Sequence, residues 1–303
     1  MINRVAHVAI EVPDLEATVQ FYKEYIGLEV TERDDETAYL TCNERHHEAI
    51  LIQSPNGATG LHHLALEVPT GGLSDAIDSA VAAGARLIGP TVEPGVQEAV
   101  MIEDPNGFRW KLYSGMEWVP ALPRTSLPRP LTFSHYNIAG PDVPNMATFV
   151  REGFDLRPSD WLGDKDDPFV CWYHCPTVGA LHHGIAIIKA QTVKLHHVAY
   201  DYASIGDLAA RVDHYVTRDR LLVWGMGRHG TGGGLFAYVE DPAGLMIELS
   251  AEMIRIGDDP RWDQPEVWEL DDPRGVNTWG SPVPEPWLAH GVPLANSAVA
   301  RPA

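Results

Sequence analysis

Four short stretches of the chain share one pattern of apolar and polar residues. They read RVAHVAIEV at residues 4–12, GLHHLALEV at 60–68, TFSHYNIAG at 132–140 and KLHHVAYDY at 194–202. Successive side chains of a β-strand point to opposite faces. In the last stretch, Val198 and Tyr200 would therefore share one face, and His197 would lie on the other. Each stretch is predicted to be a strand, and a histidine on its wetter face could line a cavity.

A helical pattern follows each of these strands. Apolar residues recur there every three or four positions, which is typical of an amphipathic helix. They are Leu15, Val19, Tyr22 and Ile26, then Leu73, Ile77 and Val81, then Met146, Phe149 and Val150, and finally Leu208, Val212 and Tyr215. We expect Gly27, Gly84 and Gly153 to end the first three helices, and Ser204 with Asp207 to open the fourth. Short alternating strands come next, so each unit is predicted to be a βαβββ module and the fold class α+β.

A coarser repeat divides the chain into two domains. The pair His63 and Asp104 recurs as His197 and Asp241 at nearly the same spacing, so the last two modules duplicate the first two. A segment between the halves, WVPALPRTSLPRP, is rich in proline and is predicted to be a semi-rigid linker. We expect an N-terminal domain, this linker, a C-terminal domain and a tail that breaks the repeat, at residues 1–117, 118–130, 131–250 and 251–303.

The composition is that of a globular protein without a nucleic-acid or membrane partner. Of 303 residues, 45% are hydrophobic and 21% are charged. The net charge of −20 disfavours binding to nucleic acids or anionic membranes. No apolar run approaches the roughly 20 residues of a membrane span. The first residues lack a secretory signal and the cysteine count is odd, so we expect a cytoplasmic protein in a reducing compartment.

Three residues of the C-terminal domain have the types and positions of a metal site. His135 lies on the first strand of the third module, His197 on the first strand of the fourth, and Glu248 on its last strand. The repeat places all three at matching strand ends. Two neutral imidazoles and one carboxylate form the facial triad of mononuclear non-haem Fe(II) sites, with Mn(II) as a substitute. The alternative is two hydrogen-bonded histidines and a surface glutamate without a metal.

Two further motifs do not indicate separate sites. Cys171, His174 and Cys175 could hold zinc, but strand alternation separates His174 from the two cysteines. The run from Gly230 to Gly234 has the glycine content of a phosphate loop, yet it leads into a strand and lacks the GK[ST] signature. We interpret the cysteines as core or wall residues and the glycine run as a turn.

Several longer stretches carry a resemblance to a known family. They are SHYNI around His135, LHHGIAII around His183, LHHVAY around His197, and GMGRHGTGGGLFAYVEDPAGLMIEL at residues 225–249. Over essentially its whole length the chain resembles the type I extradiol ring-cleaving dioxygenases of the vicinal oxygen chelate superfamily, such as catechol 2,3-dioxygenase and homoprotocatechuate 2,3-dioxygenase. The resemblance implies that each pair of modules forms an open, barrel-like mixed sheet, and that the triad binds Fe(II).

The same resemblance implies roles for three more residues. His229 would contact the ligand set from outside, and Tyr238, ten residues before Glu248, would face the substrate. One of His182 and His183 must point inward from its strand. The family pattern favours His183, which would act as general acid/base. The alternative is a plain strand histidine.

The N-terminal domain keeps only part of the metal pattern. His7 and His63 occupy the matching histidine positions, but FRWKLY places Lys111 where the counterpart of Glu248 should be. An ammonium beside two imidazoles would repel a divalent ion. We therefore expect a vestigial copy with a structural role. Lys111 also disfavours a glyoxalase-type isomerase, which would need a usable glutamate in paired sites.

The tail is rich in tryptophan. We expect its four indoles to be buried against other parts of the protein, because large aromatic side chains gain by burial; they are Trp262, Trp268, Trp279 and Trp287. In relatives such a segment covers the active-site mouth as a lid. A subunit contact is the alternative, and both can hold. We expect a homo-oligomer, either a dimer or a tetramer.

The expected activity is extradiol cleavage of a catechol by O2 at Fe(II), which gives a ring-opened semialdehyde or keto acid. Relatives that bind carboxylated catechols use arginines in two stretches that read LLVWGM and GVNTWG here, so a neutral or apolar substituent is favoured. Arg228 and Arg274 keep the alternative open. Two other classes remain: a 2-oxo-acid-using dioxygenase with the same triad, and a non-catalytic small-molecule-binding protein.

Overall fold

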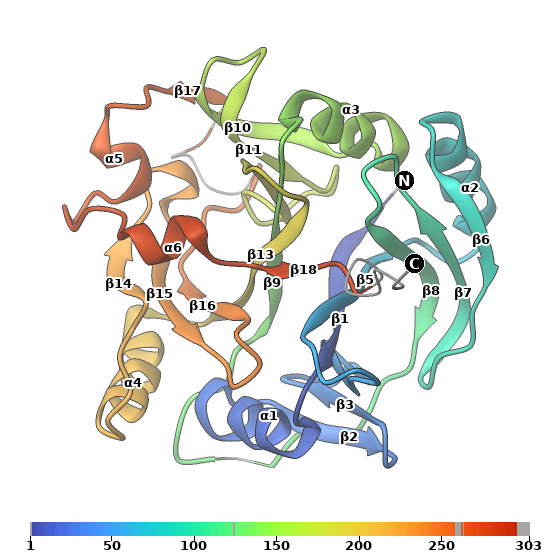
Figure 1. Cartoon of the computed structure of the whole chain (residues 1–303), viewed down its shortest axis with the longest axis horizontal. Coiled ribbons are helices and arrows are strands. Elements are labelled where there is room, and N and C mark those ends of the chain that lie inside the picture. Colours follow the sequence, from blue (N-terminus) through green and yellow to red (C-terminus); the bar gives the residue numbers. More distant parts are fainter. Residues whose placement is uncertain (1, 124, 258–261, 263, 296–303) are drawn as a thin grey trace.

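Two mixed β-sheets with few helices form the two halves of the molecule (Figure 1). The computed structural model describes residues 2–123, 125–257, 262 and 264–295. The first sheet has the strand order β2-β3-β4-β1-β5-β8-β7-β6. Its elements are β1 (Arg4–Val12), α1 (Leu15–Phe21), the π-helix η1 (Tyr22–Ile26), β2 (Glu29–Arg33), β3 (Thr37–Thr41), β4 (Ala49–Gln53), β5 (Gly60–Glu67), α2 (Leu73–Ala82), β6 (Arg86–Pro90), β7 (Val96–Glu103) and β8 (Arg109–Met116).

The second sheet repeats this arrangement and adds strands from the tail. Its order is β14-β15-β16-β13-β9-β12-β11-β10-β17, and β18 pairs with β13. Its elements are β9 (Thr132–Gly140), α3 (Val143–Phe154), β10 (Arg157–Gly163), β11 (Pro168–His174), β12 (Ile185–Lys189), β13 (Lys194–Tyr202), α4 (Ile205–Val216), β14 (Trp224–Arg228), the 3-10 turn η2 (Thr231–Gly233), β15 (Leu235–Glu240), β16 (Met246–Ala251), β17 (Glu266–Trp268), α5 (Pro273–Val276), α6 (Glu285–Ala289) and β18 (Val292–Pro293).

Each sheet consists of two βαβββ modules that meet at an antiparallel seam. β1 pairs with β5 in the first sheet, and β9 pairs with β13 in the second. The first strand of a module also pairs in parallel with its last strand, as β5 does with β8 and β13 with β16. Among the described residues no ladder joins the two edges of a sheet, so both sheets are open. The expected α+β fold of paired modules is confirmed.

One helix end differs from the expectation. Gly27 does end the first helical segment, with a φ of 91°, and Ser204 Oγ accepts from Asp207 N at 3.2 Å where α4 begins. In contrast, α3 continues through Gly153, and the left-handed residue that follows it is Asp155, with a φ of 56°. An aspartate tolerates this conformation better than most residues. The prediction that Gly153 ends this helix is therefore wrong.

A continuous apolar core joins the two domains. It includes residues of both sheets, among them Ile10, Leu66, Phe133 and Tyr200. The Tyr136 hydroxyl crosses the boundary and donates to the main-chain oxygen of Ala65 at 2.6 Å. Helices also pair across it, α2 with α3 (Figure 1) and η1 with α4. The duplicated halves therefore share one buried interior.

The tail crosses the C-terminal sheet. β17 extends the sheet edge beside β10, and β18 adds to β13. Trp287 is buried, and Trp262 and Trp268 are partly buried. Trp279 is 51% exposed, with the Arg228 guanidinium 6.0 Å from its ring centre, so the expectation that all four indoles are buried is wrong there. No helix in the described ranges is long and apolar enough to span a membrane.

Candidate metal centre and cavity

His135, His197 and Glu248 converge on adjacent strands of the second sheet. Ala199 on β13 pairs with Glu248 on β16 and with His135 on β9, which brings the three side chains together. The Nε2 atoms of both histidines lie 3.3 Å from Glu248 Oε2. One donor atom from each residue lies within 4.8 Å of the others, and all three residues are buried. This compact donor set fits a divalent transition-metal ion.

Neighbouring groups orient the two imidazoles. Ser134 Oγ lies 3.1 Å from His135 Nδ1. His196 Nε2 lies 2.8 Å from the main-chain oxygen of Trp287, so that nitrogen must carry the proton. His196 Nδ1 is then an acceptor, and it takes a hydrogen bond from His197 Nδ1, 2.7 Å away. His197 therefore presents an unprotonated Nε2 to Glu248, as a metal ligand must.

The electrostatics favour the protonation states that a metal requires. Burial alone would raise the pKa of Glu248, but His135 and His197 beside it hold that pKa well below its usual range. Burial lowers the pKa of His197 to about 4. The carboxylate is thus ionised and this imidazole neutral near pH 7, so neither has to lose a proton when an ion binds.

A cavity of about 80 Å³ opens onto the triad. Its walls are mainly apolar and come from the sheet and the tail: Leu162, Phe169, Val170, Trp172, Ala186, Ile188, Val276, Val283, Trp287 and Leu288. Its polar groups besides the triad include His183, His229 and Tyr238. The three residues predicted to surround the metal therefore line the same cavity as the predicted ligands.

His183 is the inner end of a buried chain of polar groups. Its ring centre lies 4.4 Å from that of His135. His183 Nδ1 is 3.1 Å from His182 Nδ1, and His182 Nε2 is 3.2 Å from Asp160 Oδ2. The carboxylate favours a proton on His182 Nε2, so His182 Nδ1 accepts from His183. This leaves His183 Nε2 free for chemistry in the cavity.

His229 and Tyr238 form a second hydrogen-bonded pair. His229 Nδ1 donates to the main-chain oxygen of Val276 at 2.6 Å, and His229 Nε2 lies 3.2 Å from the Tyr238 hydroxyl. Burial lowers the pKa of His229 and raises the pKa of Tyr238 well above its usual range. Tyr238 therefore keeps its proton and donates, while His229 is a neutral acceptor.

A second cavity, of about 270 Å³, lies at the domain boundary and is also lined by His183. Its wall includes Arg4, Thr132 and Arg255. His183 belongs to the linings of both cavities.

The N-terminal domain contains a related cluster with an unexpected member. Lys111 pairs with Ala65 as Glu248 does with Ala199, so it does occupy the position of the missing glutamate. Glu93, from the loop between β6 and β7, supplies a carboxylate that the sequence analysis did not identify. The only indication of Glu93 in the sequence is its place in TVEPG, a loop that corresponds to the loop carrying His229.

The cysteine motif makes no metal site. Cys171 and Cys175 are buried free thiols, and His174 Nδ1 lies 2.8 Å from Ser159 Oγ. Neither of the two groups of metal donors found among the described residues contains any of the three.

Comparison with known proteins identifies the family. The profile described as the Glyoxalase/Bleomycin resistance protein/Dioxygenase superfamily matches residues 4–112 and 132–249. The chain belongs to this superfamily. Within it, the chain is 25% identical to metapyrocatechase from Geobacillus stearothermophilus over 99% of this chain and 97% of that protein. It is also 25% identical to the manganese-dependent 2,3-dihydroxybiphenyl 1,2-dioxygenase of Geobacillus genomosp. 3, over 94% and 96% of the two chains.

A solved structure of the same superfamily shares the whole fold. Homoprotocatechuate 2,3-dioxygenase from Brevibacterium fuscum, in an anaerobic complex with 3,4-dihydroxyphenylacetate, superposes with a TM-score of 0.86 and 25% sequence identity. The match covers 96% of this chain and 92% of the other. The similarity therefore extends beyond one domain to the arrangement of all four modules.

Proposed function

We propose that the protein is an extradiol dioxygenase that cleaves the ring of a catechol with O2 at a mononuclear Fe(II) site, with Mn(II) as the alternative ion. The observation that carries the proposal is the compact His135, His197 and Glu248 triad on the wall of an apolar cavity. Relatives that span the whole chain are ring-cleaving dioxygenases. The product is a ring-opened semialdehyde or keto acid.

His135, His197 and Glu248 would hold the ion, which would supply the Lewis-acid and redox chemistry for the reaction of a catechol with O2. The remaining work falls to the protein. His183 accepts a proton from a catechol hydroxyl at Nε2 and returns it when the O–O bond breaks. Its chain of contacts through His182 to Asp160 supports this role, because the carboxylate stabilises the imidazolium that forms.

Tyr238 and His229 fix the orientation of the substrate. Tyr238 donates its hydrogen bond to His229 and lies on the cavity wall, where its hydroxyl oxygen can accept a hydrogen bond from a substrate hydroxyl. His229 is held by the tail through Val276. The ordered pair restricts the substrate to one pose, and such positioning is a large part of catalysis.

We propose a catechol with an apolar substituent. No arginine or lysine lines the cavity within the described residues. Arg228 pairs with Glu252 at 2.7 Å, and Arg274 pairs with Asp272 at 2.6 Å. The solved relative binds 3,4-dihydroxyphenylacetate, which carries a carboxylate. Burying such a charge without a partner would be costly here.

We also propose that the tail is a lid, that the protein is cytoplasmic and that it forms a homo-oligomer. Val276, Val283 and Trp287 form part of the cavity wall, which supports the lid.

The buried free thiols support a reducing compartment. Trp279 and Leu270, which are 51% and 63% exposed, give the outer side of the tail an apolar surface for a subunit contact.

The test is anaerobic loading with Fe(II) or Mn(II), followed by O2 uptake with a panel of catechols. We expect about one ion per chain and turnover of 3-alkyl or 3-aryl catechols in preference to carboxylated ones. His197→Ala should abolish both metal binding and turnover, while the matched His63→Ala variant keeps both. Turnover that requires a 2-oxo acid, or metal-loaded protein that binds catechols without consuming O2, would contradict the proposal.

A further inference from the structure

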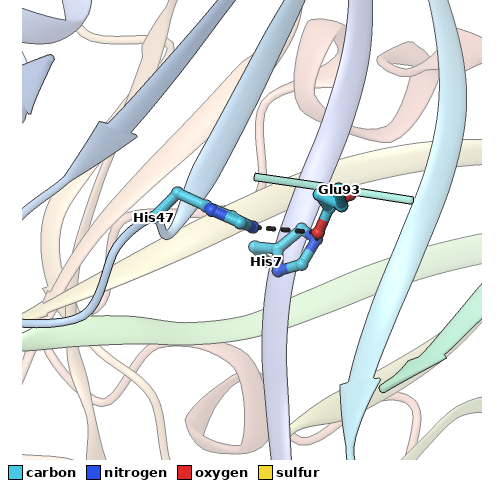
Figure 2. A group of neighbouring side chains, drawn as sticks. All are labelled: His7, His47 and Glu93. Atoms are coloured by element: carbon cyan, nitrogen blue, oxygen red, sulfur yellow. Dashed lines mark hydrogen bonds and ion pairs between the residues drawn. The ribbon is translucent and has the colours of Figure 1, made fainter. Parts of the chain in front are cut away.

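The N-terminal domain buries five ionisable side chains around one point. His7 comes from β1, His63 from β5 and Lys111 from β8, while His47 precedes β4 and Glu93 lies in the loop between β6 and β7. All five are at most 5% exposed. Figure 2 shows His7, His47 and Glu93 pointing toward one another from three separate segments. No step of the proposed reaction uses them.

Glu93 is the centre of this cluster. Its Oε1 lies 3.1 Å from His47 Nε2 and 3.3 Å from His7 Nε2 (Figure 2). Its Oε2 lies 3.8 Å from His63 Nε2 and accepts a hydrogen bond from Lys111 Nζ. One donor atom each from His7, His47 and Glu93 lies within 4.8 Å of the others, the same spacing that the C-terminal triad meets.

Several ring nitrogens here lack the partners that buried groups normally have. Both nitrogens of His7 and Nε2 of His63 make no hydrogen bond within the described part of the chain, although they are inaccessible to solvent. Leaving such a group unpaired costs about 1–3 kcal/mol. Burial also lowers the pKa values of His7 and His63 well below the usual range, so both imidazoles are neutral lone-pair donors. Their Nε2 atoms face the one carboxylate, as metal ligands would.

Lys111 supplies the positive charge that balances the Glu93 carboxylate. Lys111 occupies the strand position of Glu248, and Glu93 occupies the loop that corresponds to the loop of His229. Compared with the C-terminal site, the carboxylate has moved from strand to loop and an ammonium has taken the strand position. Burial lowers the pKa of Lys111 to about 7, so below that pH its side chain is an ammonium in contact with Glu93. This ammonium leaves no net negative charge to attract a divalent ion and repels one directly.

We propose that this cluster is a second His2Glu metal site in which the Lys111 ammonium takes the place of the cation. Removing the ammonium should let His7, His47 and Glu93 bind a divalent transition ion such as Co2+ or Zn2+. The inference does not depend on the proposed ring cleavage, because it concerns donor atoms and charge in the other domain.

The test is a metal count on the full-length chain in a His197→Ala background, where the C-terminal triad is incomplete. The probe is Co2+ alone, under anaerobic conditions and at a pH below the Lys111 pKa of about 7, measured by elemental analysis and by its visible absorption bands. Chains that keep Lys111 should bind essentially no Co2+ at this cluster. Lys111→Met should bind about one Co2+ per chain. The matched variant Lys111→Arg keeps a cation and should bind none, and adding Glu93→Gln to Lys111→Met should remove the gain.

Two results would overturn the proposal. One is a folded Lys111→Met chain that binds no Co2+, which would show that the donors do not form a metal site. The other is Co2+ bound in chains that keep Lys111 and lost on His47→Ala, which would show that the ammonium does not replace the ion. If Lys111→Met folds poorly, Co2+ or Zn2+ should restore its circular dichroism, because the buried Glu93 then lacks a cation. Failure of both ions to do so also contradicts the proposal.

Discussion

The two domains carry the same strand ladders but opposite charges at one strand position. In the C-terminal domain that position on β16 is Glu248, and an imidazole, His229, lies in the loop between β14 and β15 of the same module. In the N-terminal domain the position on β8 is Lys111, and the loop provides Glu93. The first cluster needs an external cation, whereas the second is neutralised internally. One reversal of charge therefore separates a candidate metal centre from a structural cluster on the same scaffold.

The tail adds a second difference between the domains, because it contacts residues of the C-terminal site. It provides the main-chain oxygens that fix His196 and His229, those of Trp287 and Val276. It also covers Asp160, which accepts from Glu266 N at 2.8 Å and from Trp268 Nε1 at 3.1 Å. His196, His229 and Asp160 are thus held by a segment that has no counterpart in the repeat.

The largest expected effect that separates the domains is at the acid/base position. His183→Phe should keep metal and catechol binding but lower kcat by roughly 10²- to 10⁴-fold, because a positioned proton donor is lost. The measurement is steady-state O2 uptake beside anaerobic catechol binding. His47 precedes β4 as His183 precedes β12, so His47→Phe is the matched control and should leave kcat unchanged. Equal losses in the two variants would mean that the N-terminal cluster takes part in turnover.

The sequence predicted the triad because periodicity determines it. His135, His197 and Glu248 lie on strands whose alternation and repeat spacing are visible in the letters. Glu93 was missed because it lies in a loop, where no period indicates direction. The link from His182 to Asp160 was missed for another reason: it depends on the register of β10 against β11, which contains an irregularity next to Asp160. Local patterns thus located the candidate ligands but not the groups that orient them.

The next effect concerns the tail. Deleting residues 258–303 should leave the metal bound but raise KM for catechols about tenfold and make iron easier to oxidise, because water enters the cavity. KM and the rate of iron oxidation are the measurements. Trp287→Ala should reproduce part of this effect, since Trp287 lines the cavity, and Trp279→Ala should not, since Trp279 is half exposed. A truncated chain with unchanged KM and a lost oligomeric state would make the tail a subunit contact only.

A smaller effect is expected at the outer end of the His183 chain. Asp160→Asn weakens the support of His182 and should lower kcat about tenfold with little change in KM, because substrate contacts remain. In the N-terminal domain Glu32 Oε2 lies 3.3 Å from His46 Nε2 in the same relation. Glu32→Gln is therefore the matched control and should change neither constant. If Asp160→Asn raises KM without lowering kcat, the role of Asp160 is to hold the tail and not to position His183.

The smallest expected effect concerns the equivalent turns at Asp104 and Asp241. Substitutions at the two turns should change the stability of the protein differently at different pH values. Burial raises the pKa of Asp104 to about 6 and that of Asp241 to about 7, from 3.8. Both carboxyls bind a proton more tightly in the folded state. Their contribution to stability is therefore complete below about pH 4 and is lost as the pH rises through about 6 and 7. An asparagine side chain is neutral at every pH, so its contribution to stability is not lost as the pH rises.

The partners of the two carboxyls decide which substitution is tolerated. Asp104 Oδ2 accepts from Trp110 Nε1 at 2.9 Å, and an indole N–H can only donate. Asp241 instead neighbours the Tyr22 hydroxyl, which can also accept. Asp241→Asn should thus stabilise the protein at pH 8 by on the order of 1 kcal/mol, seen as a raised Tm by calorimetry. Asp104→Asn should lower Tm at pH 5 and pH 8 alike, because one amide group cannot satisfy both the indole and the turn. A gain in both variants would show that burial of charge, and not the bonding partner, dominates at both turns.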